Sequence, residues 1–239
     1  MSSIRDAMNR RTIHEHALAV TDEAGLAVSA LLTLPAEPSA CYVFAHGAGA
    51  GMAHPFMHEV AHGLAARGVA TLRYQFPSME RGSKRPDVPA VAHRAVRAAV
   101  AAASRSTRLP LIAGGKSFGG RMTSQAQAFE PLANVRGLVF LGFPLHAPDK
   151  PSVERAKHLA DVAVPMLFVQ GTRDKLAPVA GIEAVTASLQ DRATLLLLAD
   201  ADHGFDVLVR SGRTHEEVMA QLLDGVSAWV TAVMGGAAA

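Results

Sequence analysis

Ser117 lies in the stretch L-I-A-G-G-K-S-F-G-G, residues 111–120, which could serve either of two chemistries. The Gly-Lys-Ser could close a phosphate-binding loop, but that loop needs a further glycine five residues before the one that precedes the lysine. Pro110 occupies that position, and proline has no amide hydrogen with which to wrap a phosphate. The other pattern, G-x-S-x-G between a strand and a helix, is fully matched by residues 115–119. The spacing therefore predicts that Ser117 is a nucleophile on a sharp turn.

A serine hydroxyl is a weak nucleophile, so this prediction requires a histidine base and an acid that orients it. Where a strand–turn–helix displays such a serine, the acid and then the histidine follow on loops beyond later strands. Asp174 follows the apolar run M-L-F-V, and His203 follows L-L-L-L, so both stand where they are required. Asp174 could instead cap the helix after it, and three aspartates near the histidine compete for its role. They are Asp200, Asp202 and Asp206, which we expect to shape the loop because they are too near in sequence to reach the far ring nitrogen.

The third requirement is a pair of amide donors for the negative charge that develops on the substrate oxygen. The run C-Y-V-F-A opens into H-G-A-G-A-G, residues 46–51, whose glycines let a backbone N–H turn toward the serine. We expect Ala48 to supply one donor of this oxyanion hole, with Gly49 as the neighbour that could replace it. Phe118, the residue after the nucleophile, is expected to supply the other. The alternative for 46–51 is a flexible turn after a strand.

A second motif, H-E-V-A-H at residues 58–62, matches the zinc-peptidase pattern H-E-x-x-H. That chemistry needs both histidines to face a pocket and a third ligand further along the chain. Val60 and Leu64 are expected to face the sheet, and residues two apart differ by about 200° around a helix, so a stripe of histidines should face solvent. The stripe consists of His54, His58 and His62. No third ligand continues the longer zinc patterns, and Glu80 is expected in a non-helical loop. We predict no metal site, although exposed histidines can pick up metal adventitiously.

The elements that would position these residues alternate regularly. Residues 12–20 and 26–34 are predicted to form an antiparallel hairpin around a turn at 22–25. Six unalternating apolar runs then suit strands buried on both faces, with helical stretches between them. These strands are expected at 42–45, 69–72, 111–113, 138–141, 166–169 and 195–198, and the helices at 55–67, 88–104, 118–130, 178–189 and 214–234. This rhythm predicts an α/β fold: a mostly parallel sheet of about eight strands with helices on both faces. Segment 143–163 has room for one short helix but not for a lid domain.

Length and composition restrict the class of protein. A chain of 239 residues, 49% of them hydrophobic, suits one domain over 1–239 with flexible ends at 1–11 and 235–239. No stretch approaches the roughly 20 apolar residues that span a bilayer, so no membrane contact is expected. The single cysteine, Cys41, excludes an internal disulfide and fits the cytoplasm. A net charge of +2 and 5% aromatic content argue against a nucleic-acid partner. The sequence does not determine the oligomeric state.

Lys116 stands directly before the nucleophile. Two interpretations remain open: a functional one, in which it contacts an acidic substrate or pairs with Glu80, and a structural pair that holds the turn. The basic run R-G-S-K-R at 81–85 follows the strand at 69–72, and its loop should emerge at the same sheet edge as the serine. If these charges converge there, they would attract a carboxylate or phosphate on the substrate.

With these residues in place, the chain resembles the α/β-hydrolase superfamily over nearly its whole length. It is most similar to small dienelactone-hydrolase-like proteins, and among them to a subgroup related to a subunit of a histone acetyltransferase complex. The subgroup resemblance rests on F-A-H-G-A-G-A at 44–50, F-P-S-M-E at 76–80, G-K-S-F-G-G-R at 115–121 and F-P-L-H at 143–146.

The resemblance implies a three-layer α/β-hydrolase sandwich without a lid domain. It also implies a triad of Ser117, His203 and Asp174 that hydrolyses small acyl substrates, esters or thioesters, without a cofactor. Dienelactone hydrolase itself uses cysteine as its nucleophile, so its lactone substrate is not carried over to this chain. The relatives in the acetyltransferase complex leave an alternative: a non-catalytic binding or scaffold protein that keeps the fold.

Overall fold

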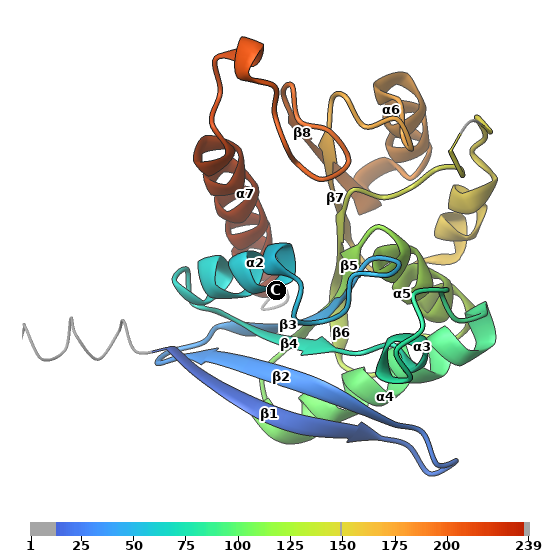
Figure 1. Ribbon diagram of the computed structural model, residues 1–239, viewed down its shortest axis with the longest axis vertical. Coiled ribbons are helices and arrows are strands. Elements are labelled where there is room, and N and C mark those ends of the chain that lie inside the picture. The colour runs from blue at the N-terminus through green and yellow to red at the C-terminus, as the bar shows by residue number, and fades with distance from the viewer. Residues whose placement is uncertain (1–12, 149, 237–239) are drawn as a thin grey trace, which may run out of the picture.

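A computed structural model describes residues 13–148 and 150–236, in which eight strands form a single sheet (Figure 1). The strands are β1 (Ile13–Thr21), β2 (Ala27–Pro35), β3 (Ala40–Ala45), β4 (Val69–Tyr74), β5 (Leu111–Lys116), β6 (Val135–Leu141), β7 (Met166–Gly171) and β8 (Ala193–Leu198). Their order across the sheet is β1-β2-β4-β3-β5-β6-β7-β8. β2 pairs antiparallel with both β1 and β4, and every other neighbouring pair is parallel. The predicted mostly parallel sheet is confirmed.

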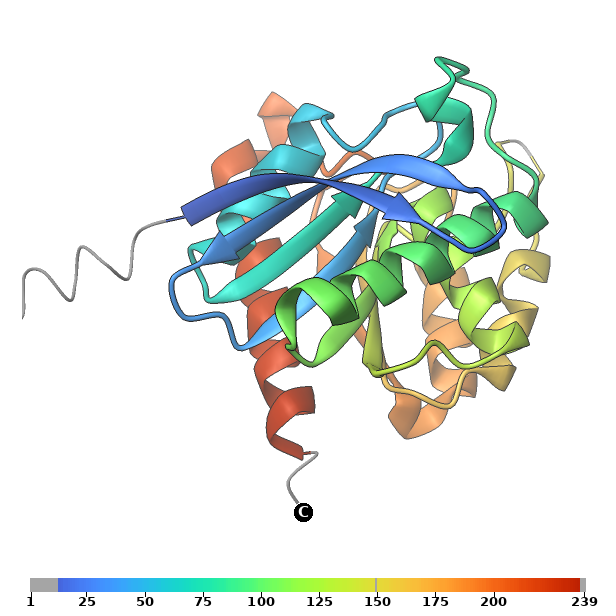
Figure 2. The same cartoon turned by 90° about the horizontal axis from the view of Figure 1, so that it is seen from below.

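Helices cover both faces of the sheet, which gives the three predicted layers (Figures 1 and 2). They are α2 (Pro55–Ala65), α3 (Pro77–Glu80), α4 (Pro89–Thr107), α5 (Phe118–Phe129), α6 (Val179–Ser188) and α7 (His215–Gly236), with 3-10 helices η1 (Glu154–Asp161), η2 (Gln190–Arg192) and η3 (Val209–Ser211). Apolar side chains of α2 and α7 form one core with one face of the sheet. Those of α4, α5 and α6 form a second core with the opposite face.

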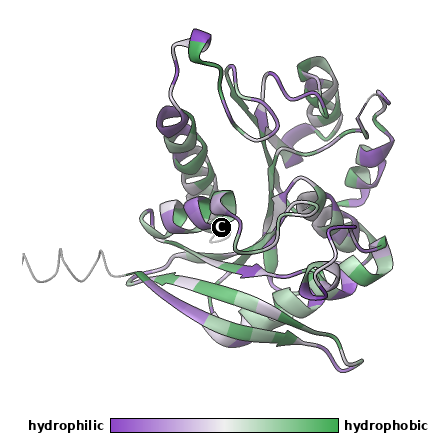
Figure 3. Ribbon diagram, in the orientation of Figure 1, coloured by the Kyte–Doolittle hydropathy of each residue, from purple (hydrophilic) through white to green (hydrophobic). Residues whose placement is uncertain are grey.

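The unalternating apolar runs become strands that are buried on both faces. Every residue of β3, β4 and β7 is buried, whereas most of β1, at the sheet edge, is exposed or half-buried. Hydrophobic residues accordingly run through the central strands, while hydrophilic ones gather on helices and loops (Figure 3). Parallel pairing places the carboxyl ends of six strands, β3 to β8, along one edge of the sheet, where loops can bring distant residues together.

Two local expectations differ from the structure, at residues 77–80 and at the C-terminal end, whereas the short helix expected in 143–163 is present. Residues 77–80, expected in a non-helical loop, form α3, because proline suits the first position of a helix. The short helix expected in 143–163 is the 3-10 helix η1, and no lid domain occurs in the described residues 142–148 and 150–165. The flexible end expected at 235–239 is partly wrong, since residues 235 and 236 complete α7. The flexible ends expected at 1–11 and 237–239 lie outside the described residues.

α7 corrects the expectation that no stretch reaches the length of a membrane span. By length and composition alone, this 22-residue helix could cross a membrane, with a mean hydropathy of 1.3 over its most apolar window. Val218, Leu222, Val226 and Val230 recur every four residues along it and are buried against the sheet. That period is typical of a helix packed on a core, which accounts for much of its apolar composition.

Candidate active site

Ser117 occupies the turn between β5 and α5, at the carboxyl end of a central strand. Its backbone adopts φ 49° and ψ −113°, a positive φ that is uncommon for a residue with a side chain. The strand and helix approach so closely that a Cβ on Gly115 would lie 2.3 Å from the carbonyl oxygen of Ala45. A Cβ on Gly119 would lie 2.6 Å from the same oxygen. Both flanking glycines of G-x-S-x-G are therefore required by direct contact with β3.

The structure brings Ser117, His203 and Asp174 together from three strand ends. Ser117 Oγ lies 2.9 Å from His203 Nε2, and His203 Nδ1 lies 2.6 Å from Asp174 Oδ2. Because the carboxylate accepts the hydrogen of Nδ1, the lone pair of Nε2 faces the serine hydroxyl. Such an arrangement can remove the proton of a serine as it attacks a carbonyl carbon.

Asp174 is held in a buried and hydrogen-bonded position, with 3% of its surface exposed. Its Oδ2 also accepts a hydrogen bond from Gln170 Nε2, and its Oδ1 accepts one from the Leu176 N–H at 2.7 Å. These donors replace the water that burial removes from a carboxylate. The alternative role as a helix cap is not observed, because α6 follows Pro178 and has no side-chain cap.

None of the three aspartates near His203 takes the place of Asp174 at its ring. Asp202 Oδ1 accepts hydrogen bonds from two N–H groups of the same loop, at 2.8 and 3.1 Å. Asp200 occupies a tight turn with φ 59°, and Asp206 Oδ1 lies 3.7 Å from His215 Nδ1. The ring nitrogens of His203 are already engaged by the serine and by the acid beyond β7.

Two amide groups lie beside Ser117 with their hydrogens available. Ala48 lines the same cavity as Ser117, and a Cβ on the adjacent Gly47 would lie 3.9 Å from Ser117 Cβ. Phe118 is the first residue of α5, where backbone N–H groups have no partner inside the helix. Within residues 13–148 and 150–236, neither the Ala48 nor the Phe118 amide donates to a protein acceptor. Both could stabilise an oxyanion.

His46 fixes the loop that carries the first of these amides. Its Nε2 accepts the N–H of Phe76 at 3.0 Å, and its Nδ1 donates to the Gly47 carbonyl at 2.7 Å. Burial lowers the pKa of His46, which keeps the ring neutral, as this pair of bonds requires. Phe76 also packs edge-on against Phe118, so one aromatic ring supports both amide-bearing segments.

One interpretation of the sequence pairs Lys116 with Glu80. The structure does not show this pair. The ammonium group of Lys116 donates a hydrogen bond to the backbone carbonyl of His203 and lies 5.0 Å from the centre of the Phe205 ring. Burial lowers the pKa of Lys116 to about 8, against the opposing effect of nearby aspartates. Glu80 instead accepts hydrogen bonds from the N–H and hydroxyl of Ser29, which attaches α3 to β2. The structural interpretation of Lys116 is the one that the contacts support.

A cavity of about 480 Å³ opens beside Ser117 and His203. The other lining residues that bear on binding are Ala48, Phe56 and Met57, which are apolar, and His54, Glu59, Lys116, Asp206 and His215, which are polar. Most of them come from α2, from the loop after β8 and from the start of α7. The sequence offered no signal for these lining residues beyond the position of α2 directly after the loop at 46–51.

The basic run at 81–85 does not converge on the serine. Arg81 pairs with Asp87 at 3.2 Å, and the same carboxylate accepts the N–H of Ser78 at the start of α3. Neither Arg81 nor Lys84 nor Arg85 lines the cavity. The expected preference for acidic substrates depended on these basic side chains lying close to Ser117, and they do not line its cavity.

The H-E-V-A-H helix matches its prediction on the apolar side and departs from it on the polar side. Val60 and Leu64, which were expected to face the sheet, are fully buried, and His58 is exposed. His62, expected to face solvent, is half-buried, and its Nε2 lies 3.7 Å from Glu15 Oε2 on β1. Glu59 lies 3.1 Å from His215 Nε2 and contributes to the cavity rim. The peptidase arrangement of two histidines with this glutamate is therefore not formed.

A family model described as "Alpha/beta hydrolase domain" matches residues 38–231 of the chain. A dienelactone hydrolase from Anabaena variabilis superposes with a TM-score of 0.74 at 21% identity, covering 92% of this chain and 97% of that one. An α/β serine hydrolase without a lid from Xanthomonas campestris gives 0.70 at 19% identity, with 90% and 95% covered. The esterase domain of a Rhodothermus marinus protein gives 0.68 at 17% identity, with 90% and 97% covered. At these identities the structures show a shared fold, which confirms the predicted three-layer architecture.

Proposed function

The chain belongs to the alpha/beta hydrolase domain family, and we propose that it is a serine hydrolase of small carboxylic esters or thioesters. The observation that supports this most directly is the continuous hydrogen-bonded line from Asp174 through His203 to Ser117, beside a cavity. In this proposal Ser117 is the nucleophile, His203 is the general base and acid, and Asp174 orients the imidazole.

In the acylation step, Ser117 Oγ forms a bond to the substrate carbonyl carbon while His203 Nε2 takes the hydroxyl proton. The π electrons of the carbonyl move to its oxygen, and the amides of Ala48 and Phe118 stabilise that charge. Collapse of the tetrahedral intermediate breaks the bond to the leaving group. The leaving group takes the proton from His203 and departs as an alcohol or a thiol.

In the deacylation step, water attacks the acyl carbon and His203 takes one of its protons. The second tetrahedral intermediate releases Ser117 Oγ, which recovers the proton from the imidazolium. One water is consumed for each ester or thioester, and a carboxylic acid is the second product. No cofactor takes part in either proposed step.

The proposed substrates are small and uncharged in their acyl part. The cavity of about 480 Å³ lies in the lower part of the range of roughly 300–1,000 Å³ that is common for small-molecule sites. Phe56 and Met57 supply an apolar surface suited to a short aliphatic or aromatic group. The rim carries the carboxylates of Glu59 and Asp206 and none of the basic run at 81–85. These two carboxylates oppose the ammonium group of Lys116 in the same lining, so the cavity offers a substrate carboxylate no excess of positive charge.

A fluorophosphonate probe and an ester assay test the proposal together. The wild-type protein should react covalently at Ser117 and should hydrolyse p-nitrophenyl acetate, whereas folded Ser117→Ala should do neither. Equal hydrolysis by the two proteins would refute a serine mechanism. Failure of the folded wild type to take up the probe would favour the alternative, a non-catalytic scaffold.

Three finer proposals rest on the sequence. The relation to the subgroup with the acetyltransferase-complex subunit is supported by the four quoted segments, at 44–50, 76–80, 115–121 and 143–146. A cytoplasmic location is supported by the single cysteine, Cys41, which is buried as a free thiol. The proposed partner is a small acyl substrate, with neither nucleic acid nor membrane.

A further inference from the structure

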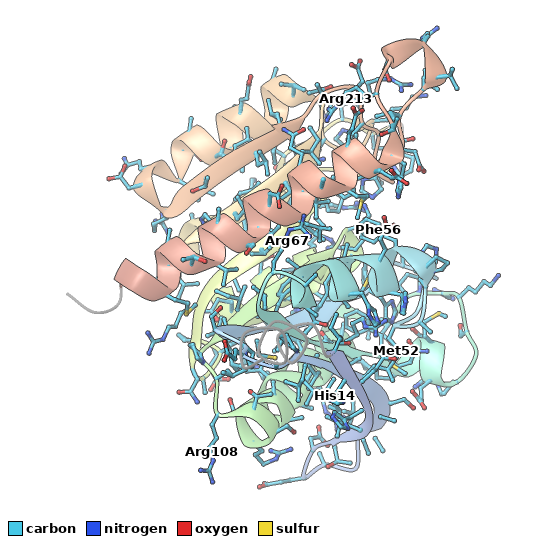
Figure 4. All side chains as sticks on the ribbon, turned by 90° about the vertical axis from the view of Figure 1, so that its left-hand side faces the viewer. His14, Met52, Phe56, Arg67, Arg108 and Arg213 are labelled. Atoms are coloured by element: carbon cyan, nitrogen blue, oxygen red, sulfur yellow. The ribbon has the colours of Figure 1, made fainter. Side chains whose placement is uncertain are left out.

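Glu15, His58 and His62 each place one ligand atom within 4.8 Å of the other two. We propose that these three residues bind one Zn²⁺ ion, at a site separate from the proposed catalytic centre, and that the ion ties β1 to α2. Figure 4 shows this side of the molecule, with His14 marking β1 and Met52 marking the turn before α2.

The two histidines are arranged as a chelating pair. His58 and His62 stand four residues apart on α2, so their rings lie above one another on the same side of the helix. Their ring centroids are 4.1 Å apart. The third donor comes from an earlier part of the chain, which is why the motif at 58–62 shows no third ligand in its own sequence.

The Nε2 atom of His62 is the feature that points to a bound ligand. This nitrogen is buried and has no hydrogen-bond partner in the described part of the chain. The nearest acid is Glu15, whose Oε2 lies 3.7 Å away, which is longer than a hydrogen bond. A neutral imidazole with an unused nitrogen is the form that binds a metal ion.

Glu15 is held in place by hydrogen bonds from two side chains of the sheet. Its Oε2 accepts hydrogen bonds from the guanidinium of Arg73 and from the hydroxyl of Thr33 at 3.1 Å. Within residues 13–148 and 150–236 no donor contacts Oε1, which leaves this oxygen available as a ligand while Oε2 stays anchored. Hydrogen bonds of this kind orient ligating carboxylates in metal sites.

The donor set selects the class of metal. Two imidazole nitrogens and one carboxylate oxygen suit Zn²⁺, whereas Mg²⁺ and Ca²⁺ prefer oxygen ligands alone. His58 is exposed, so a water molecule can complete the tetrahedron. Glu59 turns to His215 and cannot act as the base of a zinc peptidase. The ion is therefore proposed as a structural bridge to an edge strand.

Calorimetric titration of tag-free, chelator-treated protein with ZnCl₂ tests the site. One equivalent should bind, and free Zn²⁺ at about 100 times the dissociation constant should raise the melting temperature by roughly 5 to 10 °C. His58→Ala removes an exposed ligand without touching the core and should weaken binding at least about tenfold. Bound Co²⁺ should show a visible absorption band in the wild type that is lost in the variant.

Two further variants separate this site from other histidines. His14 lies on β1 next to Glu15 and faces the opposite side of the sheet, because successive strand residues alternate. His14→Ala should therefore bind Zn²⁺ as the wild type does. His215→Ala removes the histidine beside Glu59 and Asp206 at the cavity rim. If His58→Ala binds as tightly as the wild type, or if only His215→Ala loses binding, the proposed site is wrong. Stoichiometry far below one would likewise overturn it.

Discussion

The ammonium group of Lys116 donates a hydrogen bond to the backbone carbonyl of His203. The residue before the proposed nucleophile therefore holds the loop that presents the proposed base. The two are 87 positions apart in the chain, so this bond fixes the separation of two strand ends from within the site. The rings of Phe56 and Phe205 lie 5.9 and 5.0 Å from the same nitrogen and shield it from water.

Lys116→Met should lower kcat for p-nitrophenyl acetate about tenfold, the effect of losing one charge-assisted hydrogen bond, and should change KM little. The reason is that methionine fills the space but no longer anchors the loop of His203. Lys175→Met, next to Asp174 but exposed, is the matched control and should leave both constants unchanged. An effect on KM alone would instead assign Lys116 to substrate binding.

The stability difference between wild type and Lys116→Met should depend on pH. The pKa of Lys116 falls from 10.5 to about 8 on folding. At pH values between 8 and 10.5 the unfolded chain binds more protons than the folded one. The free energy of unfolding of the wild type therefore increases as the pH rises. The gain should reach about 1.4 kcal/mol per pH unit.

Urea melts of both proteins at pH 7, 8, 9 and 10 would measure this effect. Burial raises the pKa of Cys41 to about 12 and also raises the pKa of Tyr42 and Tyr74. These groups are present in both proteins, so their contribution cancels in the difference. The difference should be flat below about pH 7 and should climb above pH 8 in favour of the wild type. A flat difference up to pH 10 would show that the pKa of Lys116 is not lowered.

Asp174→Asn should lower kcat by about three to four orders of magnitude with the fold retained. An amide in this position no longer stabilises the imidazolium and can orient the wrong tautomer of His203. Asp202→Asn is the comparison, because Asp202 Oδ1 accepts hydrogen bonds from two N–H groups of the loop and does not contact the ring of His203. Its kcat should stay within about tenfold of the wild type, corresponding to about 1.4 kcal/mol. If Asp202→Asn proved the more damaging change, the acid would be misassigned.

Gly119→Ala should destabilise the protein severely, by about 3 kcal/mol or more, because the new methyl group would meet backbone oxygens of β3 and the residue after it. The contacts would be 2.6 Å to the carbonyl oxygens of both Ala45 and His46. Gly235→Ala, in α7 with open space around its Cα, is the control and should be neutral or slightly stabilising. Thermal melts followed by circular dichroism compare the two. Similar melting temperatures for both variants would mean that the turn has room for a side chain.

The turn at Ser117 could be predicted from the sequence because its determinants are local. Residues 115–119, the buried run before them and the helix after them are contiguous. A phosphate-binding loop would need glycine at position 110, where the chain has proline, whereas G-x-S-x-G places no requirement on that position. His203 and Asp174 could be predicted for a related reason, since each directly follows a recognisable strand. The physical rule involved, that parallel strands share one carboxyl edge, needs no knowledge of side-chain packing.

Contacts that depend on side-chain direction could not be predicted. Lys116 and Glu80 carry opposite charges on neighbouring loops, but Glu80 turns to Ser29 on β2 and Lys116 turns toward β8. Likewise, helical periodicity placed His62 among solvent-facing residues, because periodicity describes one helix and carries no information on the strand that lies beside it. For the same reason the sequence does not indicate that Glu15 of β1 lies beside His62.

β8 forms the edge of the sheet and is paired on one side only, with β7. Its residues are mostly half-buried, in contrast to the fully buried strands at the centre. Edge elements of this kind can open locally at a lower free energy than the whole domain. Fraying of β8 would carry His203 away from Ser117 while β3, β5 and β6 kept their pairing. On gentle warming the chain should therefore stop turning over substrate, reversibly, at temperatures where its circular dichroism still reports a native sheet.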